Sequence, residues 1–306
     1  MPATANVLSS AQIEEFIRHG IVKVEGALDT AVAKKWVDAS WGRNGYDPND
    51  RSTWTQDKIH MPTVECVDAS LVAPRAYAAI CQLCGGEERI RTPIPWGDAF
   101  IANYGMGADQ EWVPPGPRAD GWHKDGDFFV HFLDSPEQAL LTIVLWDDVV
   151  PRGGATFVAC DSVAPVARFL LEHPEGVNPM GNGGEYGVGF PHRQFISQCG
   201  DFREATGKAG DVYLMHPFML HTSSRNHAGR ARFITNPPVH FKEPMRFDRE
   251  RAEDHCPVER AVLRALGVER QPFAPTAPRR ALVPPRVAYQ QKLRQEEEAR
   301  KKAGKP

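Results

Sequence analysis

The chain has 306 residues, 42% of them hydrophobic and 25% charged, which is the composition of an ordinary globular protein. A formal net charge of −3 provides no basic field for nucleic acid or an anionic membrane, and no apolar run is long enough to span a bilayer. Neither end carries a signal peptide or a retention or peroxisomal signal. We therefore expect a cytoplasmic protein with no nucleic-acid partner and no membrane insertion, and the oligomeric state stays open.

The first 95 residues are expected to form a helical N-terminal part. Ser9 and Gln12 have the spacing of a capping box, and Gly20 is placed to end that helix. Cys81 and Cys84 form a CxxC pair without a second ligand pair nearby, which favours buried helix cysteines over a zinc site and leaves a redox pair open. The other elements expected here are a strand at 21–26, a helix beginning at Asp29 or Thr30, an irregular stretch at 44–63 and a helix at 68–84.

Short strand-like runs alternate with turn residues from about residue 96. Strands at this spacing, without long helices between them, favour an antiparallel sandwich or barrel. The fold class is therefore expected to be mainly β with flanking helices. The runs lie at 98–104, 127–133, 139–149, 155–160, 211–216 and 231–241.

Two loops rich in glycine and proline, at 105–120 and 172–194, interrupt this region. Long loops inside a compact domain are frequently lids or binding loops, so we expect these two to set substrate specificity.

The strand-like runs stop after residue 245. We expect a single domain at 1–245, made of the helical part at 1–95 and a core at 96–245, followed by an extension at 246–306. The last helix of the extension is expected to be a solvated terminus, with a partner contact as the alternative. The predicted elements of the extension are a helix from Pro257 to Gly267, a proline-rich extended segment at 271–285 and a charged helix at 286–303.

His123 and Asp125 stand two residues apart at the head of a predicted strand. Residues i and i+2 of a strand face the same side, and an imidazole beside a carboxylate suits a first-row metal. Alone, the pair also fits a surface strand start with a hydrogen-bonded histidine. His221, at the end of a later strand, supplies a third ligand, and the three together form a 2-His-1-carboxylate facial triad, which leaves positions open on Fe(II).

Arg230 and Arg232 follow at the start of the next strand. The open positions of the metal can take a bidentate 2-oxo acid and O2. The planar guanidinium of Arg232, eleven residues past His221, can bind the far carboxylate of 2-oxoglutarate with two hydrogen bonds.

These residues together resemble the phytanoyl-CoA hydroxylase-like branch of the Fe(II)/2-oxoglutarate-dependent dioxygenases. The family pattern after the distal histidine is a short Gly/Ser stretch, an Asn and then Arg-x-Arg, and HTSSRNHAGRAR matches it with Ser223, Asn226, Arg230 and Arg232. An N-terminal F-x-x-x-G-x-x-x-V-x-G pattern and the run ALLTIVLWDDVVPRGGATFV also fit, so the resemblance spans roughly residues 10–245. One departure is ACDSVAP, where family members often carry Gly-Ser-His at a position that binds no metal.

The resemblance implies a core with the double-stranded β-helix (jelly-roll, cupin-like) fold and with iron in its mouth. By carry-over, His123, Asp125 and His221 bind Fe(II) and are the catalytic residues. The implied contacts of 2-oxoglutarate are Arg232 on the distal carboxylate, Ser223 as its helper, Thr142 as a further candidate, and Arg230 as the rival of Arg232.

The implied enzyme is an oxidoreductase, a dioxygenase that uses Fe(II), 2-oxoglutarate and O2, hydroxylates an unactivated C–H bond of a small organic molecule, and releases succinate and CO2. Asp125 is present where related halogenating enzymes carry a small residue, which favours hydroxylation and leaves desaturation and ring formation open. The substrate, lipid-like or a natural product, stays open, because nothing in the sequence shows a basic patch for CoA phosphates.

Trp122, Phe129 and His131 flank the metal motif and are candidate substrate contacts, although Trp122 and Phe129 also fit the core. Lys124, between the two ligands, is expected to point away from the metal, and Gly126 is expected to turn the chain.

Two other functions stay open. A cupin-like jelly-roll can bind a metal without 2-oxoglutarate, as an isomerase or lyase, and a non-catalytic jelly-roll can serve as a binding protein. The spacing of Arg232 disfavours the first function, and the intact triad disfavours the second.

Overall fold

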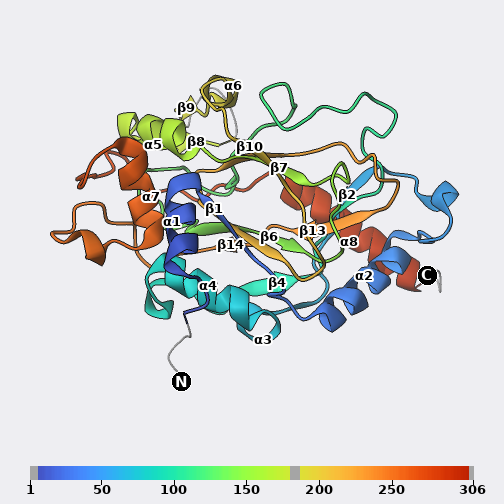
Figure 1. Cartoon of the computed structure of the whole chain (residues 1–306). Coiled ribbons are helices and arrows are strands. Elements are labelled where there is room, and N and C mark those ends of the chain that lie inside the picture. The colour runs from blue at the N-terminus through green and yellow to red at the C-terminus, as the bar shows by residue number, and fades with distance from the viewer. Residues whose placement is uncertain (1–5, 180–186, 303–306) are drawn as a thin grey trace.

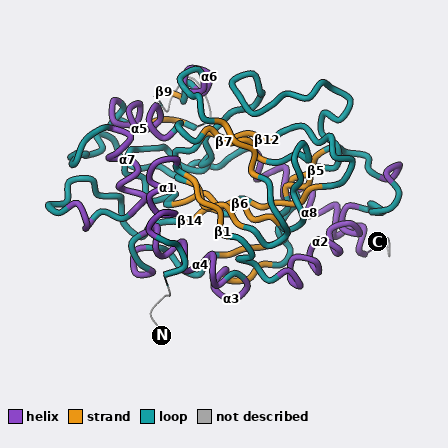
Figure 2. Tube along the Cα trace, in the orientation of Figure 1, coloured by secondary structure: helices purple, strands orange, loops and turns teal. Residues whose placement is uncertain are grey.

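The computed structural model describes residues 6–179 and 187–302. Strands gather in the centre of the molecule and helices surround them (Figures 1 and 2). In these two ranges, no helix combines the length and the apolar character that crossing a membrane requires. The helices hold more of the described residues than the strands do, so the expected mainly-β fold is corrected to a mixed α and β fold with antiparallel sheets.

The larger sheet has seven strands among the described residues, all paired antiparallel. Its strand β6 reads LLTIVL, and all six side chains are buried, as expected for a run of branched apolar residues with both faces covered. Leu141 and Ile143 contact one apolar cluster, while Leu140 and Val144 on the other face contact a second. The spatial order is β1 (Ile21–Val24), β11 (Val212–Met215), β6 (Leu140–Leu145), β13 (Arg232–Thr235), β5 (Ile101–Asn103) and β2 (Lys58–His60), with β14 (Pro238–Val239) also paired to β6.

A smaller antiparallel sheet packs on one face of the larger one. Its strands, in spatial order, are β10 (Phe202–Ala205), β7 (Thr156–Ala159) and β12 (Leu220–Ser223). Val158 and Ala205 share an apolar cluster with Leu141 and Ile143, so the two sheets face each other across this cluster. At the open edge of β12, the segment that contains His123 adds one further antiparallel pairing.

Helices cover the outside of the sheets, and α7 packs against α1, α4 and α5 on the left in Figure 1. The helices are α1 (Ser10–His19), α2 (Thr30–Asn44), α3 (Ala69–Val72), α4 (Pro74–Cys84), α5 (Val163–Glu172), α6 (His192–Ile196), α7 (Pro257–Leu266) and α8 (Arg286–Lys302). The minor elements are the antiparallel pair β3 (Cys66–Asp68) and β4 (Pro95–Gly97), the parallel pair β8 (Val177–Asn178) and β9 (Val188–Gly189), and 3-10 turns at Arg51–Thr53, Glu87–Arg89 and Ala252–Asp254.

The helix ends follow the predicted capping residues. The Ser9 side chain accepts from the backbone N–H of Gln12 and the Gln12 side chain accepts from that of Ser9, which confirms the capping box of α1. Asp29 caps α2 through its side chain, which accepts from the backbone N–H of Ala31 at 2.8 Å. The helix predicted at 68–84 is interrupted at Ala73, because a residue that precedes proline is disfavoured in the helical region.

The cysteines of the CxxC pair lie on α4. Both are buried, and all six cysteines of the chain are free. Burial raises the pKa of Cys81 to about 11, so this thiol is protonated at neutral pH. The environment is therefore that of buried helix cysteines.

The strand predicted at 127–133 is absent, and this prediction was wrong. Gly126 turns the chain with a φ of 110°, and a Cβ added there would lie 2.6 Å from the ring of His131. After the turn, Phe129 and His131 form isolated bridges to two different segments. The turn at Gly126 is as predicted, and it prevents one strand from continuing through the metal motif.

The two predicted loops differ. Residues 105–120 contain no helix or strand, as expected. The segment 172–194 includes β8, β9 and the start of α6, and its residues 180–186 lie outside the described part of the chain. The role of both loops in specificity stays a prediction.

The C-terminal helix α8 is docked on the domain, which corrects the expected solvated terminus. Glu297 of α8 accepts from Nε of Arg43 at 3.0 Å, and both side chains are less than a tenth exposed. Arg43 also binds Asp98 at 2.9 Å, and Arg300 donates to the carbonyl of Arg43 at 2.7 Å. One apolar cluster includes side chains on both sides of residue 245, and the domain boundary there stays a prediction.

Glu259 of α7 binds groups outside this helix, and replacing its carboxylate is expected to destabilise the protein. Its fully buried carboxylate accepts from Nη2 of Arg89 at 2.6 Å and from the backbone N–H groups of Arg246 and Cys256. We expect Glu259→Gln to lower the free energy of unfolding by about 3 kcal/mol, because Arg89 then keeps a partly buried charge without its partner. Glu253→Gln on the exposed turn is the matched control, with an expected change within about 0.5 kcal/mol.

The same variant should change the acid dependence of stability. Burial alone would raise the pKa of Glu259, but Arg89 and the two N–H groups lower it below its ordinary value of 4.5. Such a carboxylate stabilises the fold fully above its unfolded pKa, and the stabilisation is lost as the pH falls through the lower folded pKa. Urea unfolding should therefore show a shallower decline below pH 4.5 for Glu259→Gln than for the parent, and parallel declines would contradict this prediction.

Candidate metal centre and co-substrate pocket

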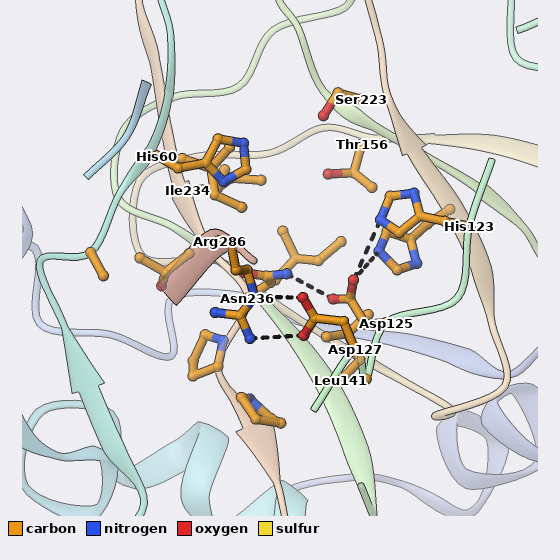
Figure 3. Close-up of a pocket in the computed structure, with 18 of the residues that line it drawn as sticks. His60, His123, Asp125, Asp127, Leu141, Thr156, Ser223, Ile234, Asn236 and Arg286 are labelled. Atoms are coloured by element: carbon orange, nitrogen blue, oxygen red, sulfur yellow. Dashed lines mark hydrogen bonds and ion pairs between the residues drawn. The ribbon is translucent and has the colours of Figure 1, made fainter. Parts of the chain in front are cut away.

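Two imidazoles and one carboxylate converge at the edge of the smaller sheet (Figure 3). Oδ1 of Asp125 lies 3.4 Å from Nε2 of His123 and 3.5 Å from Nε2 of His221, and the three ligand atoms are all within 4.8 Å of one another. His123 and His221 are directly paired, with backbone N–H···O distances of 3.0 Å in both directions, so both side chains face one side. The structure thus brings the three predicted ligands together.

Backbone carbonyls orient both imidazoles. Nδ1 of His123 donates to the carbonyl of Gly121 at 2.8 Å, and Nδ1 of His221 donates to that of Met219 at 3.2 Å. A carbonyl oxygen only accepts, so each Nδ1 carries a proton, and each Nε2 faces Asp125 as the nitrogen available to a metal. Such partners hold histidine ligands in the orientation that a metal requires.

Asn236 orients the carboxylate. Its Nδ2 donates to Oδ2 of Asp125 at 2.7 Å, which leaves Oδ1 facing the two imidazoles (Figure 3). Burial alone would raise the pKa of Asp125, but the His221 and His123 rings lower it well below its usual range. The group is therefore an ionised oxygen ligand, and the set of two imidazoles and one carboxylate fits a first-row divalent metal.

A row of polar residues crosses the larger sheet beside the triad. Lys58 and Arg232 are both paired with Asn103, from β2 and β13 on its two sides. Directly paired residues of antiparallel strands face the same side, and Ile234, two residues after Arg232, lines the cavity that contains the triad. The two cations therefore lie on the cavity side of the sheet.

Arg232 has an unused donor. Its Nε binds the carbonyl of Gly154 at 2.7 Å and its Nη1 binds that of Ile101 at 2.9 Å, while Nη2 is buried without a hydrogen-bond partner in the described ranges. Burial lowers the pKa of Arg232 to about 9, and burial together with the charge of Arg232 lowers that of Lys58. An anion between the two cations would satisfy Nη2 and relieve their repulsion.

The cavity that contains the triad has a volume of about 690 Å³, which is the size of a small-molecule site. Its lining includes the polar residues Lys58, Thr156 and Ser223 and the apolar residues Met61 and Phe128. A second cavity of about 370 Å³ is lined by the loop 105–120 and shares Lys58, His123, Thr222 and Ser223 with the first. Both cavities thus reach the candidate metal centre.

The predicted co-substrate residues separate into two groups. Ser223 lines both cavities and accepts from Nζ of Lys58 at 2.9 Å. Thr142 lies on the face of β6 opposite to Leu141, with its hydroxyl donating to the carbonyl of Pro237 at 2.7 Å, and it lines neither cavity. Arg230 lies outside as well, with its half-exposed guanidinium 3.1 Å from Asp147. Of the four, Ser223 lines the cavities, and Arg232 lies behind their lining on the same face of the sheet as Ile234, whereas Thr142 and Arg230 face elsewhere.

The predicted substrate contacts lie behind the cavity wall. Trp122 is buried with its indole N–H on the carbonyl of Gly116, and Phe129 is packed against His131. Nδ1 of His131 lies 2.7 Å from Nζ of Lys124, and none of the three predicted residues lines either cavity. Lys124 does line the larger cavity, and its ammonium is turned to His131.

The sequence analysis missed several polar residues of the larger cavity, among them Lys58, His60, Asn236 and Arg286. Lys58 and His60 belong to a three-residue strand, which is too short to give a period-2 pattern. Asn236 directly follows β13. It is two residues after Ile234 and four after Arg232, and this spacing could have indicated that it faces the same side as they do. Arg286 lies in the extension, where nothing marked it.

No protein-family model and no curated protein matches the chain. Among solved structures, the epimerase SnoN, in complex with Fe3+, alpha ketoglutarate and nogalamycin RO, is 16% identical over 78% of this chain and 84% of that chain, with a TM-score of 0.42. HygX from Streptomyces hygroscopicus, with nickel and 2-oxoglutarate bound, is 14% identical over 76% and 87%, with a TM-score of 0.45. EctD from S. alaskensis, with 2-oxoglutarate and 5-hydroxyectoine, is 16% identical over 78% of each chain, with a TM-score of 0.41.

Proposed function

We propose that the chain is an Fe(II)- and 2-oxoglutarate-dependent oxygenase that hydroxylates an unactivated C–H bond of a small organic molecule. The observation that supports it most is the unpartnered Nη2 of buried Arg232 on the cavity side of the sheet that faces the triad. A metal site alone fits many activities, but a metal site beside the buried Arg232 and the partly buried Lys58 fits a chelating co-substrate with a second carboxylate. The two facing antiparallel sheets support a double-stranded β-helix core.

Each residue has a defined task in this proposal. His123, Asp125 and His221 would hold Fe(II), with the two Nε2 atoms and Oδ1 as ligands. Arg232 would bind the distal carboxylate of 2-oxoglutarate through Nη2, and Lys58 and Ser223 would assist. When bound, the iron would supply the redox centre at which O2 and 2-oxoglutarate react, so that R–H, 2-oxoglutarate and O2 give R–OH, succinate and CO2.

The surroundings of the triad support controlled chemistry on a bound substrate. The carbonyls of Gly121 and Met219 fix a proton on each Nδ1 and hold Nε2 toward the metal position. Asn236 prevents Asp125 from rotating away, because rotation would break a charge-assisted hydrogen bond. Apolar side chains such as Leu141, Ile143 and Ile234 line the cavity and exclude water from the reacting groups.

The test is co-substrate turnover by the purified full-length chain. With Fe(II) and O2, we expect 2-oxoglutarate to be converted slowly to succinate without added substrate, and anaerobic titration with Mn(II) to show saturable 2-oxoglutarate binding that depends on the metal. Metal binding without 2-oxoglutarate binding would favour the metal-dependent isomerase or lyase instead. Failure to bind a divalent metal would contradict both and leave a binding protein.

A further inference from the structure

The C-terminal extension builds one wall of the larger cavity. Its extended segment runs along the chain just after the metal motif, with the N–H of Leu282 donating to the carbonyl of Phe128 at 2.8 Å and the N–H of Val130 donating to that of Arg280 at 2.9 Å. The first turn of α8 follows, and Arg286 and Gln290 line the cavity. The wall is fixed at its far end by the buried pair of Glu297 with Arg43.

Arg286 points into this cavity and is bound to Asp127 (Figure 3). Nε of Arg286 donates to Oδ2 of Asp127 at 2.6 Å and Nη2 donates to Oδ1 at 2.8 Å. Both carboxylate oxygens are therefore engaged, whereas the guanidinium retains Nη1 and the second N–H of Nη2 on its end-on edge. Because that edge can bind a carboxylate with two parallel hydrogen bonds, the pair presents donors to the cavity.

The cavity between Arg286 and the metal centre has a positive potential. The pKa of His60 reflects this potential. Burial lowers it to about 4 together with the charges of Lys58, Arg232 and Arg286, while the charge of Asp125 raises it. A divalent metal together with Lys58 and Arg232 would outweigh Asp125 and the two carboxylates of 2-oxoglutarate by one positive charge. The loaded site would therefore still attract an anion.

We propose that Arg286 anchors a carboxylate group of the primary substrate, so that the C-terminal extension determines which small molecules the enzyme accepts. This inference rests on the proposed function, because it assigns the primary substrate of the same site. It makes the substrate a small organic acid, held by Arg286 at the outer end of the cavity with the rest of its body directed toward the triad. Gln290 and the neutral imidazole of His60 lie on the cavity wall as further hydrogen-bonding groups.

The test compares small acids with their uncharged counterparts. Octanoate against octanamide and phenylacetate against phenylacetamide are titrated by calorimetry into the full chain, anaerobically, with Mn(II) and 2-oxoglutarate saturating so that the Lys58–Arg232 site is filled. We expect at least one acid to bind saturably and at least about tenfold more tightly than its amide, as the loss of a charge-assisted contact implies. No saturable binding of either acid, or equal binding of acid and amide, would overturn the proposal.

Three variants distinguish a substrate-binding role of Arg286 from a role in holding α8 in place. Arg286→Gln should weaken acid binding at least about tenfold. Asp127→Asn should leave it unchanged or strengthen it, because it frees the guanidinium. If Arg286 only held α8 in place, both variants would break the same contact and weaken binding alike, which would overturn the proposal. Arg294→Gln removes the same charge from a position of α8 paired with Glu298 outside the cavity, and it should bind the acid like the parent.

The affinity for 2-oxoglutarate shows whether a negative result contradicts the role of Arg286 or the proposed function. Arg286→Gln should change it less than about twofold, because its binding groups are Arg232 and Lys58. Binding of 2-oxoglutarate without binding of either acid would overturn only the role of Arg286. A parent chain that binds no 2-oxoglutarate would contradict the proposed function itself.

Discussion

The Asp125→Ala variant is expected to lose metal-dependent succinate formation and to bind Mn(II) at least about 100-fold more weakly than the parent. Loss of a group that merely orients a metal ligand costs 10- to 100-fold in affinity, and Asp125 would be a ligand itself. Without it, the two imidazoles keep their positions through the carbonyls of Gly121 and Met219 but lack a charged partner for the dication. Equilibrium dialysis with Mn(II) measures the affinity, and 2-oxoglutarate consumption measures the turnover.

The control for this variant is Asp109→Ala. Asp109 is an exposed carboxylate in the loop before the metal motif, and it belongs neither to the triad nor to the lining of either cavity. The control should bind Mn(II) and turn over 2-oxoglutarate like the parent, with an unchanged thermal midpoint. Retention of both properties by Asp125→Ala would remove the triad from the proposed function.

The second large effect is expected at Arg232. The Arg232→Ala variant should lose 2-oxoglutarate turnover, with an affinity for 2-oxoglutarate at least about 100-fold lower, because a buried charge-assisted contact contributes up to about 3 kcal/mol. The Arg230→Ala variant should retain binding, because that side chain pairs with Asp147 at the surface, and such pairs contribute at most about 1 kcal/mol to stability. Anaerobic calorimetry with Mn(II) present measures both affinities.

A loss of folding could imitate this result, since Arg232 also binds the carbonyls of Gly154 and Ile101. Lys58→Met avoids the difficulty, because it keeps the guanidinium and removes only the second cation. Its affinity for 2-oxoglutarate should fall between those of the parent and Arg232→Ala, with Mn(II) binding unchanged. If Arg230→Ala lost more affinity than Arg232→Ala, the assignment of the carboxylate anchor would be reversed.

The convergence of the three candidate metal ligands was predictable from the sequence because local patterns indicate it. His123 and Asp125 are two residues apart, and His221 stands on one of the few strand-like runs that end in a histidine before a polar stretch. Arg232 was predictable from its distance to His221. The helix ends were predictable too, because a cap such as Ser9 with Gln12 acts within one turn.

The remainder of the site depends on contacts between segments distant in sequence. Lys58 reaches Arg232 only through the pairing of β2, β5 and β13, and β2 is three residues long. Thr142 was predicted to contact 2-oxoglutarate because it lies on the strand after the metal motif, but the sequence does not show which face of β6 meets the cavity. The segment 127–133 has the composition of a strand, but one glycine turn redirects it, and local propensity gave no indication that residue 282 would supply its partner.

The contact between the C-terminal extension and the segment after the metal motif has a consequence for biosynthesis. Phe128 and Val130 obtain their backbone partners from residues about 150 positions later, and Arg43 obtains Glu297 from 254 positions later. Because a chain grows from its N-terminus and domains fold as they emerge, these partners leave the ribosome long after the segments to which they bind. The cavity wall at Arg286 can therefore form only after residues 280–297 have been synthesised, so a nascent chain that stops before them would carry the three candidate metal ligands without the surface that we propose selects the substrate.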